Sequence, residues 1–576
     1  MAAPHLLARF DDFSGGELGL LSPRKSPRNM WTGQNCVVFP DRSIGPRFGT
    51  VRFVASGAIS DDGVHLVGWT PYGSTTFGRV WFLDYDGKVA WENVADFRSV
   101  GASWTAFTGS PVAGAGSGNA FDYWNARDAR TYLVGTDTQV SRLEHDLGTV
   151  TDPIDANAPK GRAICQYGQR MFVGAASAAG GGARTVYRVR YSAAGDFTSW
   201  PDTNYFDLPY QSEILALKPQ RDHLVIVQSS GHHWIYTGTP GVNENLREAA
   251  SWSQVVDVNN QVEGSIASLL AQGWGRTNRG ELWYAPAWRR RPTSFDGAVP
   301  RSIDHLMTQT LGSSSYTKPS PVVAGDGPDD LVIVNAGSGD TTAGSYPGGV
   351  QTLQRVDGAW TQHVLYFGID AATEAAGAVQ AACQGPFGSV FYAIFYVAGT
   401  GTECEIFWHE ACPTGPPLLD NNDSGLPRNI QSTRDDYLSY GGAATGIAFE
   451  SFFTTCDIDA RGGGELTPHH VDVKFTAVNT GDTTNTCHFE VQVVRRDVFE
   501  QPTVTGTLAP AATTAIAWDL AAASVHATVG SETQFRKRFS VSAGRVGSFA
   551  VKISEIRGVK IDEIAVYGIG EPARMP

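Results

Sequence analysis

Three pairs of residues along the chain could, by type, bind a transition metal. Two are adjacent histidines, His232–His233 and His469–His470, and the third is Cys404 with His409 five positions later. Imidazole and thiolate are ligands that zinc and related metals prefer. Side chains an odd number of positions apart in a regular strand point to opposite faces of the sheet, so no pair can share one ion. We therefore expect satisfied side chains here and no metal site.

A fourth candidate is the acidic hexapeptide DNNDSG, Asp420–Gly425, which matches the start of a calcium-binding loop. It has oxygen-bearing side chains at alternate positions and a glycine at the sixth. The twelfth position of such a loop needs a bidentate Glu, but Gln431 stands there. We expect a solvated turn between domains, with a calcium ion near Asp420 as the alternative.

Motifs of common enzyme classes are missing from the chain. It has no G-x-S-x-G, no Walker loop and no H-E-x-x-H, and its carboxylates are too numerous to select a catalytic pair. A dense basic group consists of three consecutive arginines, Arg289, Arg290 and Arg291. It is either a solvated loop tip or a contact with an acidic partner or passing phosphate. The sequence thus predicts a protein without enzymatic activity and without a cofactor.

Composition indicates an all-β protein. Of the 576 residues, 42% are hydrophobic and 18% charged, and 65 Gly and 30 Pro are spread along the chain, as many short strands with tight turns require. The net charge of −14 and the lack of a long basic run exclude a protein that grips DNA phosphates. Seven cysteines without a C-x-x-C motif indicate mostly free, buried thiols made in a reducing compartment. We expect no secretory signal, because the start of the chain has no adequate apolar region before Asp11, and no membrane insertion, because the longest apolar run, 390–398, is too short for a span.

A strand–turn–strand pattern recurs from about residue 64 to residue 410. Each unit has an apolar strand, a Gly-rich turn and a second strand that often ends in an aromatic residue. The spacing of about 40–65 residues is typical of four-stranded propeller sheets, which stack radially to bury both faces. The sequence predicts a β-propeller over 60–446, with stacked sandwiches as the alternative. The units begin at Leu66, Tyr132, Phe172, Leu224, Leu282, Leu331 and Val390.

The pattern changes near Ile447. Longer segments with cleaner alternation follow, such as HHVDVKFTAV and VKIDEIAVYGI, and these favour a separate antiparallel β-sandwich over 447–576. The segment ATEAAGAVQAAC, 372–383, could be a helix, but its Gly and the strand after it favour the start of a propeller sheet.

The opening of the chain, 1–59, fits neither pattern. From Phe13 to Val54 it has Gly or Pro every few residues, several arginines and little apolar periodicity. We expect an extended N-terminal arm that is disordered alone and gains order by packing in an assembly. Deleting 1–54 is then expected to leave a folded protein that assembles poorly.

This opening resembles the N-terminus of the tail tubular (nozzle) proteins of short-tailed bacteriophages, of the tubular protein B type. That family has a Gly-Gly start, a segment with Pro and Arg, an Asn in mid-segment and a Gly-x-x-Arg turn before the next strand. The middle of this chain, 161–238, and the closing FAVKISEIRGVKIDEIAVYGIGEP are similar to the family in order. The arm residues that carry the resemblance or could pair with neighbouring copies are Phe13, Gly15, Gly16, Glu17, Arg24, Arg28, Asn35, Gly45, Pro46 and Arg47.

The resemblance implies a structural protein of the virion tail, made in the host bacterial cytoplasm. It implies a ring, usually a homohexamer, at the distal end of the tail, through which DNA leaves without being tightly bound. Its expected partners are the adjacent upper tail ring and the tail fibres or spikes. The competing hypothesis is a propeller tail protein that binds a receptor or carbohydrate, or a glycosidase. That hypothesis requires aromatic and carboxylate residues gathered at the propeller's entrance.

Overall fold

The structure is a computed structural model, and almost every element that it describes is a β-strand. Within the described residues the one exception is a 3-10 turn, η1 (Ala179–Gly181). No helix in these parts of the chain is long and apolar enough to cross a membrane. The described residues are 4–13, 30–34, 36–39, 41–46, 50–53, 59, 63–71, 78–94, 103–109, 112–116, 119–126, 130–220, 223–230, 232–248, 274–276, 282–284, 322–324, 331–335, 350–356, 359–365, 378–385, 389–398, 401–410, 435–436, 447–448, 451–460, 464–478, 486–495, 514–521, 532–541 and 544–571.

Four antiparallel four-stranded sheets follow one another in the first half of the chain, each a simple meander. The first contains β6 (Val64–Thr70), β7 (Arg79–Asp84), β8 (Val89–Asn93) and β9 (Thr105–Ala106). The second contains β10 (Phe121–Asn125), β11 (Arg130–Gly135), β12 (Ser141–Glu144) and β13 (Thr149–Thr151). The third contains β14 (Ala163–Tyr167), β15 (Arg170–Gly174), β16 (Arg188–Tyr191) and β17 (Tyr205–Asp207). The fourth contains β18 (Ile214–Gln220), β19 (His223–Gln228), β20 (His233–Thr237) and β21 (Asn245–Glu248).

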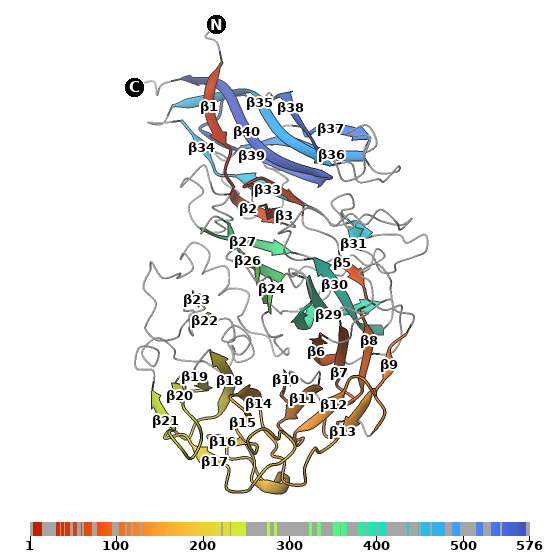
Figure 1. The fold of residues 1–576 in the computed structure, drawn as a ribbon. Coiled ribbons are helices and arrows are strands. Elements are labelled where there is room, and N and C mark those ends of the chain that lie inside the picture. Colours follow the sequence, from red (N-terminus) through yellow and green to blue (C-terminus); the bar gives the residue numbers. More distant parts are fainter. Residues whose placement is uncertain are drawn as a thin grey trace, which may run out of the picture.

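Three further sheets continue around the ring (Figure 1). The described residues of the next one form two strands, β22 (Trp274–Arg276) and β23 (Leu282–Tyr284). Then come β24 (Val322–Ala324), β25 (Leu331–Asn335), β26 (Val350–Val356) and β27 (Ala359–Leu365). The last sheet contains β28 (Ala378–Gln384), β29 (Ser389–Ala398), β30 (Gly401–Glu410) and, from the start of the chain, β5 (Thr50–Arg52). The fold is therefore a β-propeller, and 372–383 does lead into a strand.

The ring closes where the last sheet meets the first. Strand β28 lies against β6, as β6 does against β10 and β10 against β14. Strand β5 completes the last sheet by pairing with β30, with Arg52 opposite Phe407, and the Phe53 amide donates to the Ile406 carbonyl at 2.8 Å. This strand from the start of the chain therefore ties the last sheet to the segment that leads into the first one.

The propeller core lies between the sheets, so middle strands are buried on both faces. In β7, Val80 and Phe82 pack toward the last sheet with Phe391, whereas the intervening Trp81 packs toward the second sheet with Leu133. Burial on both faces explains why such strands are continuous apolar runs in the sequence.

The C-terminal part is an antiparallel β-sandwich of two six-stranded sheets. One sheet has the order β3 (Cys36–Val38), β4 (Ile44–Pro46), β40 (Val559–Glu571), β35 (Glu465–Val478) and β38 (Glu532–Ser540), with β1 (His5–Phe10) also on β40. The other has the order β2 (Met30–Gln34), β33 (Phe452–Thr455), β39 (Ser548–Arg557), β36 (Thr486–Arg495) and β37 (Ile516–Ala521), with β34 (Ile458–Asp459) also on β39. A separate pair, β31 (Asp435–Asp436) and β32 (Ile447–Ala448), precedes it.

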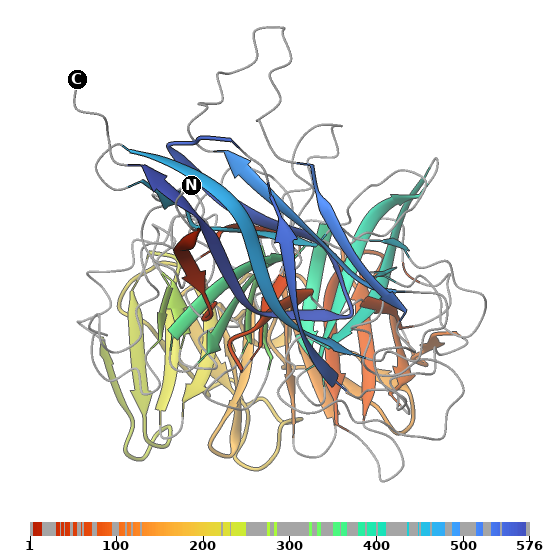
Figure 2. The same cartoon turned by 90° about the horizontal axis from the view of Figure 1, so that it is seen from above.

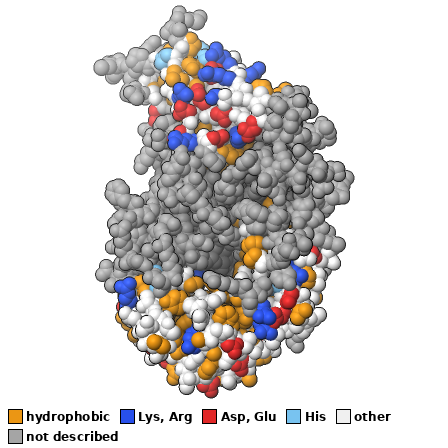
Figure 3. Space-filling view, in the orientation of Figure 1, with side chains coloured by type: hydrophobic (Ala, Val, Ile, Leu, Met, Phe, Trp, Pro, Cys, Tyr) orange, Lys and Arg blue, Asp and Glu red, His pale blue; other side chains and the backbone are white. Residues whose placement is uncertain are grey.

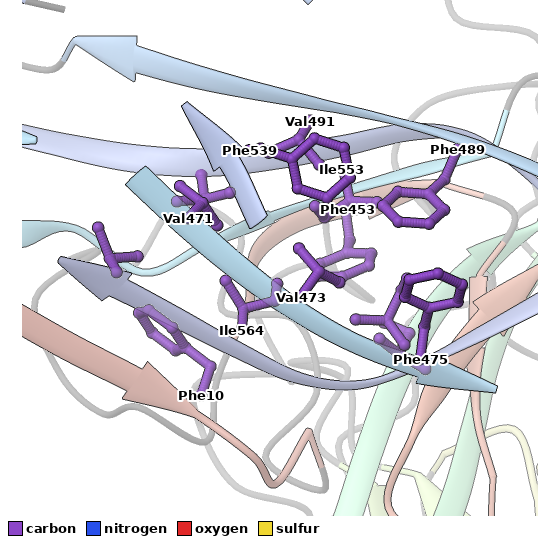
Figure 4. Close-up of a cluster of buried hydrophobic side chains, with 14 of the residues drawn as sticks. Phe10, Phe453, Val471, Val473, Phe475, Phe489, Val491, Phe539, Ile553 and Ile564 are labelled. Carbon is purple, nitrogen blue, oxygen red and sulfur yellow. The ribbon is translucent and has the colours of Figure 1, made fainter. Parts of the chain in front are cut away.

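The inner faces of these two sheets share one apolar core (Figure 4). Val473 and Phe475 of β35 face Phe489 of β36, and the rings of Phe475 and Phe489 meet edge to face at 4.8 Å. Phe10 of β1 points into the same cluster, beside Ile564. The sandwich lies on the outer rim of the propeller, where β27 contacts β2 and β3 (Figures 1 and 2).

The N-terminal segment is extended, as expected, but its described strands are not separate from the two domains. Strands β1 to β4 belong to the sandwich and β5 to the propeller. The expectation that 1–59 gains its order only in an assembly is thus wrong for these strands, which find their hydrogen-bond partners within the same chain. Sequence periodicity could not reveal this, because each strand is short and its partner lies hundreds of residues away.

Candidate functional site

The start of the N-terminal segment is anchored in the sandwich. Strand β1 runs antiparallel to β40, with Phe10 opposite Ile564. Phe13 is buried, and its ring meets that of Phe453 edge to face at 5.5 Å. The Phe13 amide donates to the Arg42 carbonyl at 3.2 Å, so this strand is also tied to the turn between β3 and β4.

That turn has a defined local geometry. Arg42 has φ of 68°, and the carboxylate of Asp41 accepts the backbone amide of Ser43 at 3.0 Å. Asp at such a position stabilises a tight turn through its side chain. Gly45 follows in β4, where a Cβ would lie 3.0 Å from the Phe39 ring and 3.1 Å from the Val559 carbonyl oxygen. The glycine therefore allows β4 to approach β40 closely.

Lys560 joins this hairpin to the rest of the sandwich. Its Nζ lies 2.8 Å from a carboxylate oxygen of Glu532 and 3.6 Å from one of Asp41, and 5.4 Å from the centre of the Phe39 ring. Only 12% of the Lys560 side chain is exposed, so these contacts are partly shielded from solvent. One ammonium thus connects the N-terminal hairpin, β38 and β40.

The outer face of the same sheet is charged. Asp472 of β35 accepts two hydrogen bonds from the Arg538 guanidinium, at 2.8 and 3.1 Å, and Arg536 lies 3.7 Å away. The hydrogen bonds from Arg538 hold the pKa of the Asp472 carboxyl below its usual range. The bidentate pair fixes the edge strand β38 to β35.

Strand β38 presents three consecutive basic residues, Arg536, Lys537 and Arg538, at the end of this sheet. The Arg536 and Arg538 side chains are 57% and 63% exposed. Within the described residues, β38 pairs with β35 and with no other strand. Figure 3 shows Lys and Arg side chains gathered on the upper part of the sandwich, with acidic side chains among them. Basic residues on an edge strand discourage random strand pairing and favour an acidic partner.

A second polar cluster lies buried between the first two propeller sheets. His145 Nε2 lies 2.8 Å from the Thr131 hydroxyl and 3.3 Å from the Thr70 hydroxyl. Asn125 accepts a hydrogen bond from each threonine and donates to the Trp69 carbonyl at 2.8 Å. Burial lowers the pKa of His145 to about 4, so the ring is neutral near pH 7. The cluster ties the two sheets together through these hydrogen bonds.

No group of three or more His, Cys, Asp or Glu side chains in the described parts of the chain is arranged to hold a metal ion. His232 Nδ1 lies 2.8 Å from a Glu248 oxygen, and His470 stacks on Tyr567 at 4.7 Å. Cys404 is buried, which raises the pKa of its thiol, and its Sγ lies 3.5 Å from Gln380 Oε1. Each of these side chains has a structural contact.

Few of the arm residues that the sequence singles out can be placed. Phe13 lies in the sandwich core, while Gly45 and Pro46 lie in β4 against β40. The residues Gly15, Gly16, Glu17, Arg24, Arg28, Asn35 and Arg47 lie outside the described residues, as do Arg289, Arg290, Arg291 and the calcium-like loop at Asp420–Gly425.

Sequence reasoning missed Lys560, Asp472 and the basic run of β38. A signal for β38 was present, because the segment ETQFRKRFS alternates until its three consecutive basic residues interrupt the pattern. No local signal existed for Lys560, since its partners Asp41 and Glu532 come from a turn and a strand that are distant in the sequence.

No protein-family model and no curated protein matches the chain. Among solved structures, Raptor from Chaetomium thermophilum is 12% identical at a TM-score of 0.35, with 64% of this chain and 30% of that chain covered. A chain of the mitotic checkpoint complex is 12% identical at a TM-score of 0.37, with 63% of this chain and 93% of that chain covered. The computationally designed Ika8 protein is 12% identical at a TM-score of 0.33, with 63% of this chain and 99% of that chain covered. This chain thus matches less than a third of the Raptor chain, and none of the three is described as a phage protein.

Proposed function

We propose that this chain is a non-enzymatic subunit of a bacteriophage tail nozzle, a ring at the distal end of the tail through which DNA passes. The proposal includes a homohexamer, contacts with the adjacent upper tail ring and with fibres or spikes, and no tight binding of the transiting DNA. The protein is made in the host cytoplasm and ends in the virion.

One observation carries the proposal. The segment that resembles the opening of the nozzle family passes through both domains, with β1 to β4 in the sandwich and β5 in the propeller. A subunit whose two domains are joined in this way is suited to act as one rigid unit of a ring. Independent domains would move relative to each other by default.

Charge is consistent with this role. Copies with a net charge of −14 repel one another unless basic groups lie at their contacts. The exposed basic strand β38 supplies such a group on the sandwich. A heterologous contact between β38 and an acidic surface of the next copy gives a closed ring when its rotation closes. The negative net charge also disfavours retention of DNA, which depends on Lys and Arg neutralising phosphates.

Mass photometry of the purified chain, alone and with its adjacent tail ring, tests the proposal. We expect a closed oligomer with six copies as its main species, and weak retention of duplex DNA at physiological salt. Cryo-electron microscopy class averages then give the symmetry. A chain that remains monomeric in both conditions contradicts the proposal, and glycan hydrolysis by the isolated chain favours the glycosidase alternative.

A further inference from the structure

Tyr210 is one of five large apolar or aromatic side chains that the described residues expose, with 42% of its surface accessible. It precedes β18, in the loop that joins the third and fourth propeller sheets. Its ring stacks on the imidazole of His232, with centroids 3.9 Å apart and planes 18° from parallel. His232 is in turn held by Glu248, 2.8 Å from its Nδ1. One face of the exposed Tyr210 ring thus packs on the His232 ring, whose orientation is fixed by Glu248.

The backbone from Tyr210 to Ser212 is also fixed. Gln228 is fully buried, and its side-chain amide donates to the carbonyls of Tyr210 and Ser212, both at 2.8 Å. Its side-chain oxygen accepts the Trp234 indole N–H at 2.7 Å. Both N–H donors of that amide group thus hold the loop, and its oxygen is fixed by Trp234 of β20. The exposed ring is therefore preorganised, which reduces the entropy lost when a ligand binds.

Ser212 lies two residues after Tyr210, and Ser230 lies in the turn that follows β19. The hydroxyls of Ser212 and Ser230 lie 2.6 Å apart and are exposed. Each hydroxyl has one donor and two acceptor positions, so the pair retains capacity for a ligand. Strand register places these groups at one end of the fourth sheet, because Ile214 pairs with Gln228 and Trp234 pairs with Glu248.

The charges around this end of the sheet compensate one another. Glu213, the residue after Ser212, is bound by Arg162 at 2.7 Å and Arg184 at 3.1 Å. Glu248 is engaged by His232. Among the described residues here, the two arginines and the two carboxylates balance, an arrangement that does not select an anionic or a cationic ligand.

We propose that Tyr210, with the hydroxyls of Ser212 and Ser230, forms a binding site for an uncharged pyranose unit of a saccharide. A pyranose has an apolar C–H face, which fits a flat exposed ring, and a rim of hydroxyls, which fits the serine pair. Protein partners normally bury a larger apolar area. The described neighbours of Tyr210 offer little, since Trp234 is 6% exposed and Leu208 is 3% exposed, which leaves Pro209 as the exposed apolar residue beside it. The inference does not depend on ring formation and includes no hydrolysis.

The test uses the full-length chain with hexasaccharides of glucose and of N-acetylglucosamine as probes, measured by saturation-transfer NMR and calorimetry. A single aromatic site of this kind is expected to bind at least one probe with a dissociation constant of about 1 mM or lower. Tyr210→Ala should weaken binding at least about tenfold, whereas Tyr210→Phe, which keeps the ring, should stay within about threefold. The double variant Ser212→Ala/Ser230→Ala should also weaken binding.

Tyr205→Ala is the matched control, because Tyr205 is 44% exposed on the same propeller but lies over Arg188 in the third sheet. It should bind as the unmodified chain does. Thermal unfolding of each variant checks the fold, and ligand-induced shifts of the His232 ring protons locate the site without any mutation. Binding of neither probe, unchanged binding by Tyr210→Ala, or Tyr210-dependent binding of a proline-rich peptide in place of both probes would overturn the proposal.

Discussion

The side-chain oxygen of Gln380 accepts the backbone N–H of Val64 at 2.9 Å, although the two residues are 316 positions apart. Val64 begins the first propeller sheet and Gln380 lies in the first strand of the last one. The bond therefore crosses the junction where the ring closes. Gly63, with φ of 109°, leaves the room for it, since a Cβ there would lie 2.1 Å from Gln380 Oε1.

We predict that Gln380→Ala lowers stability by about 1–3 kcal/mol, because the amide of the buried Val64 loses its partner. Gly63→Ala should act in the same direction, since its backbone conformation is strained for any residue with a Cβ. Gln166→Ala is the control: Gln166 lies in the first strand of the third sheet and bonds weakly to Gly168 of its own hairpin, at 3.4 Å. Denaturant unfolding of the three variants measures the difference, and equal midpoints for Gln380→Ala and Gln166→Ala would contradict the role of the Gln380 bond.

Removal of residues 1–54 should prevent normal folding. Phe10, Phe13, Val38, Ile44 and Phe53 are all buried in the two domains. Burial of each such side chain contributes about 1.5–3 kcal/mol, so their combined loss is comparable to the whole stability of a typical domain, about 5–15 kcal/mol. Circular dichroism and solubility of the truncated chain test this. A truncated protein that unfolds cooperatively near the temperature of the intact chain would restore the hypothesis of a separate arm.

A finer test uses two positions of the same strand. Phe10→Ala should cost about 3–5 kcal/mol through the cavity it leaves. Leu6→Ala should cost little, because 48% of Leu6 is exposed. Equal effects of the two variants would mean that β1 is not packed as described.

The sequence predicted the middle of most sheets better than their edges. The units starting at Phe172 and Leu224 begin in β15 and β19, second strands whose residues are almost all buried. Burial on both faces produces the strong apolar runs that made them visible. Strand β5 is Thr-Val-Arg and has no pattern of its own. Its place in the last sheet depends on β30, and local periodicity does not contain such a long-range pairing.

The candidate surfaces were harder to foresee than the fold. The basic run of β38 is visible in the sequence, but its position at a sheet edge follows only from its pairing with β35. The adjacent pair His232–His233 predicts no metal site, because neighbouring strand residues point to opposite faces. The imidazole of His232 supports Tyr210, 22 positions earlier, and a loop tyrosine carries no sequence signal of such stacking.

Stability should fall as the pH drops from about 6.5 toward 4. Burial holds the pKa of His145 at about 4, below its ordinary 6.5, so the folded protein keeps the ring neutral. The unfolded chain takes up a proton below pH 6.5, and the loss is complete once the folded form is protonated as well, at up to about 3 kcal/mol. The charge of nearby Arg79 lowers the pKa of His145 further, whereas the charge of Asp146 raises it.

His145→Gln should therefore flatten the dependence of unfolding free energy on pH between about 7 and 5. His65 is half-buried, and desolvation lowers its pKa to about 4 as well, so it contributes a loss in the same direction and His65→Phe serves as the comparison. Each variant should reduce the slope of unfolding free energy against pH. An unchanged slope in His145→Gln would show that this histidine is already exposed or protonated in the folded protein.

Reversal of charge on β38 should impair ring assembly without unfolding the subunit. Lys537 is exposed on the edge strand β38, on the face opposite to Arg536 and Arg538, and Lys537→Glu spares the bond between Arg538 and the buried Asp472. If β38 faces an acidic surface of the next copy, the substitution replaces attraction with repulsion, and the protein concentration needed for half-assembly should rise at least about tenfold at low salt. The effect should shrink toward 0.5 M salt, where charges are screened within about 5 Å. Arg247→Glu is the matched control, because Arg247 is exposed on β21 of the propeller and changes the net charge equally. Mass photometry over a concentration series measures the oligomer. Rings formed equally by both variants would place the contact between copies on a surface other than β38.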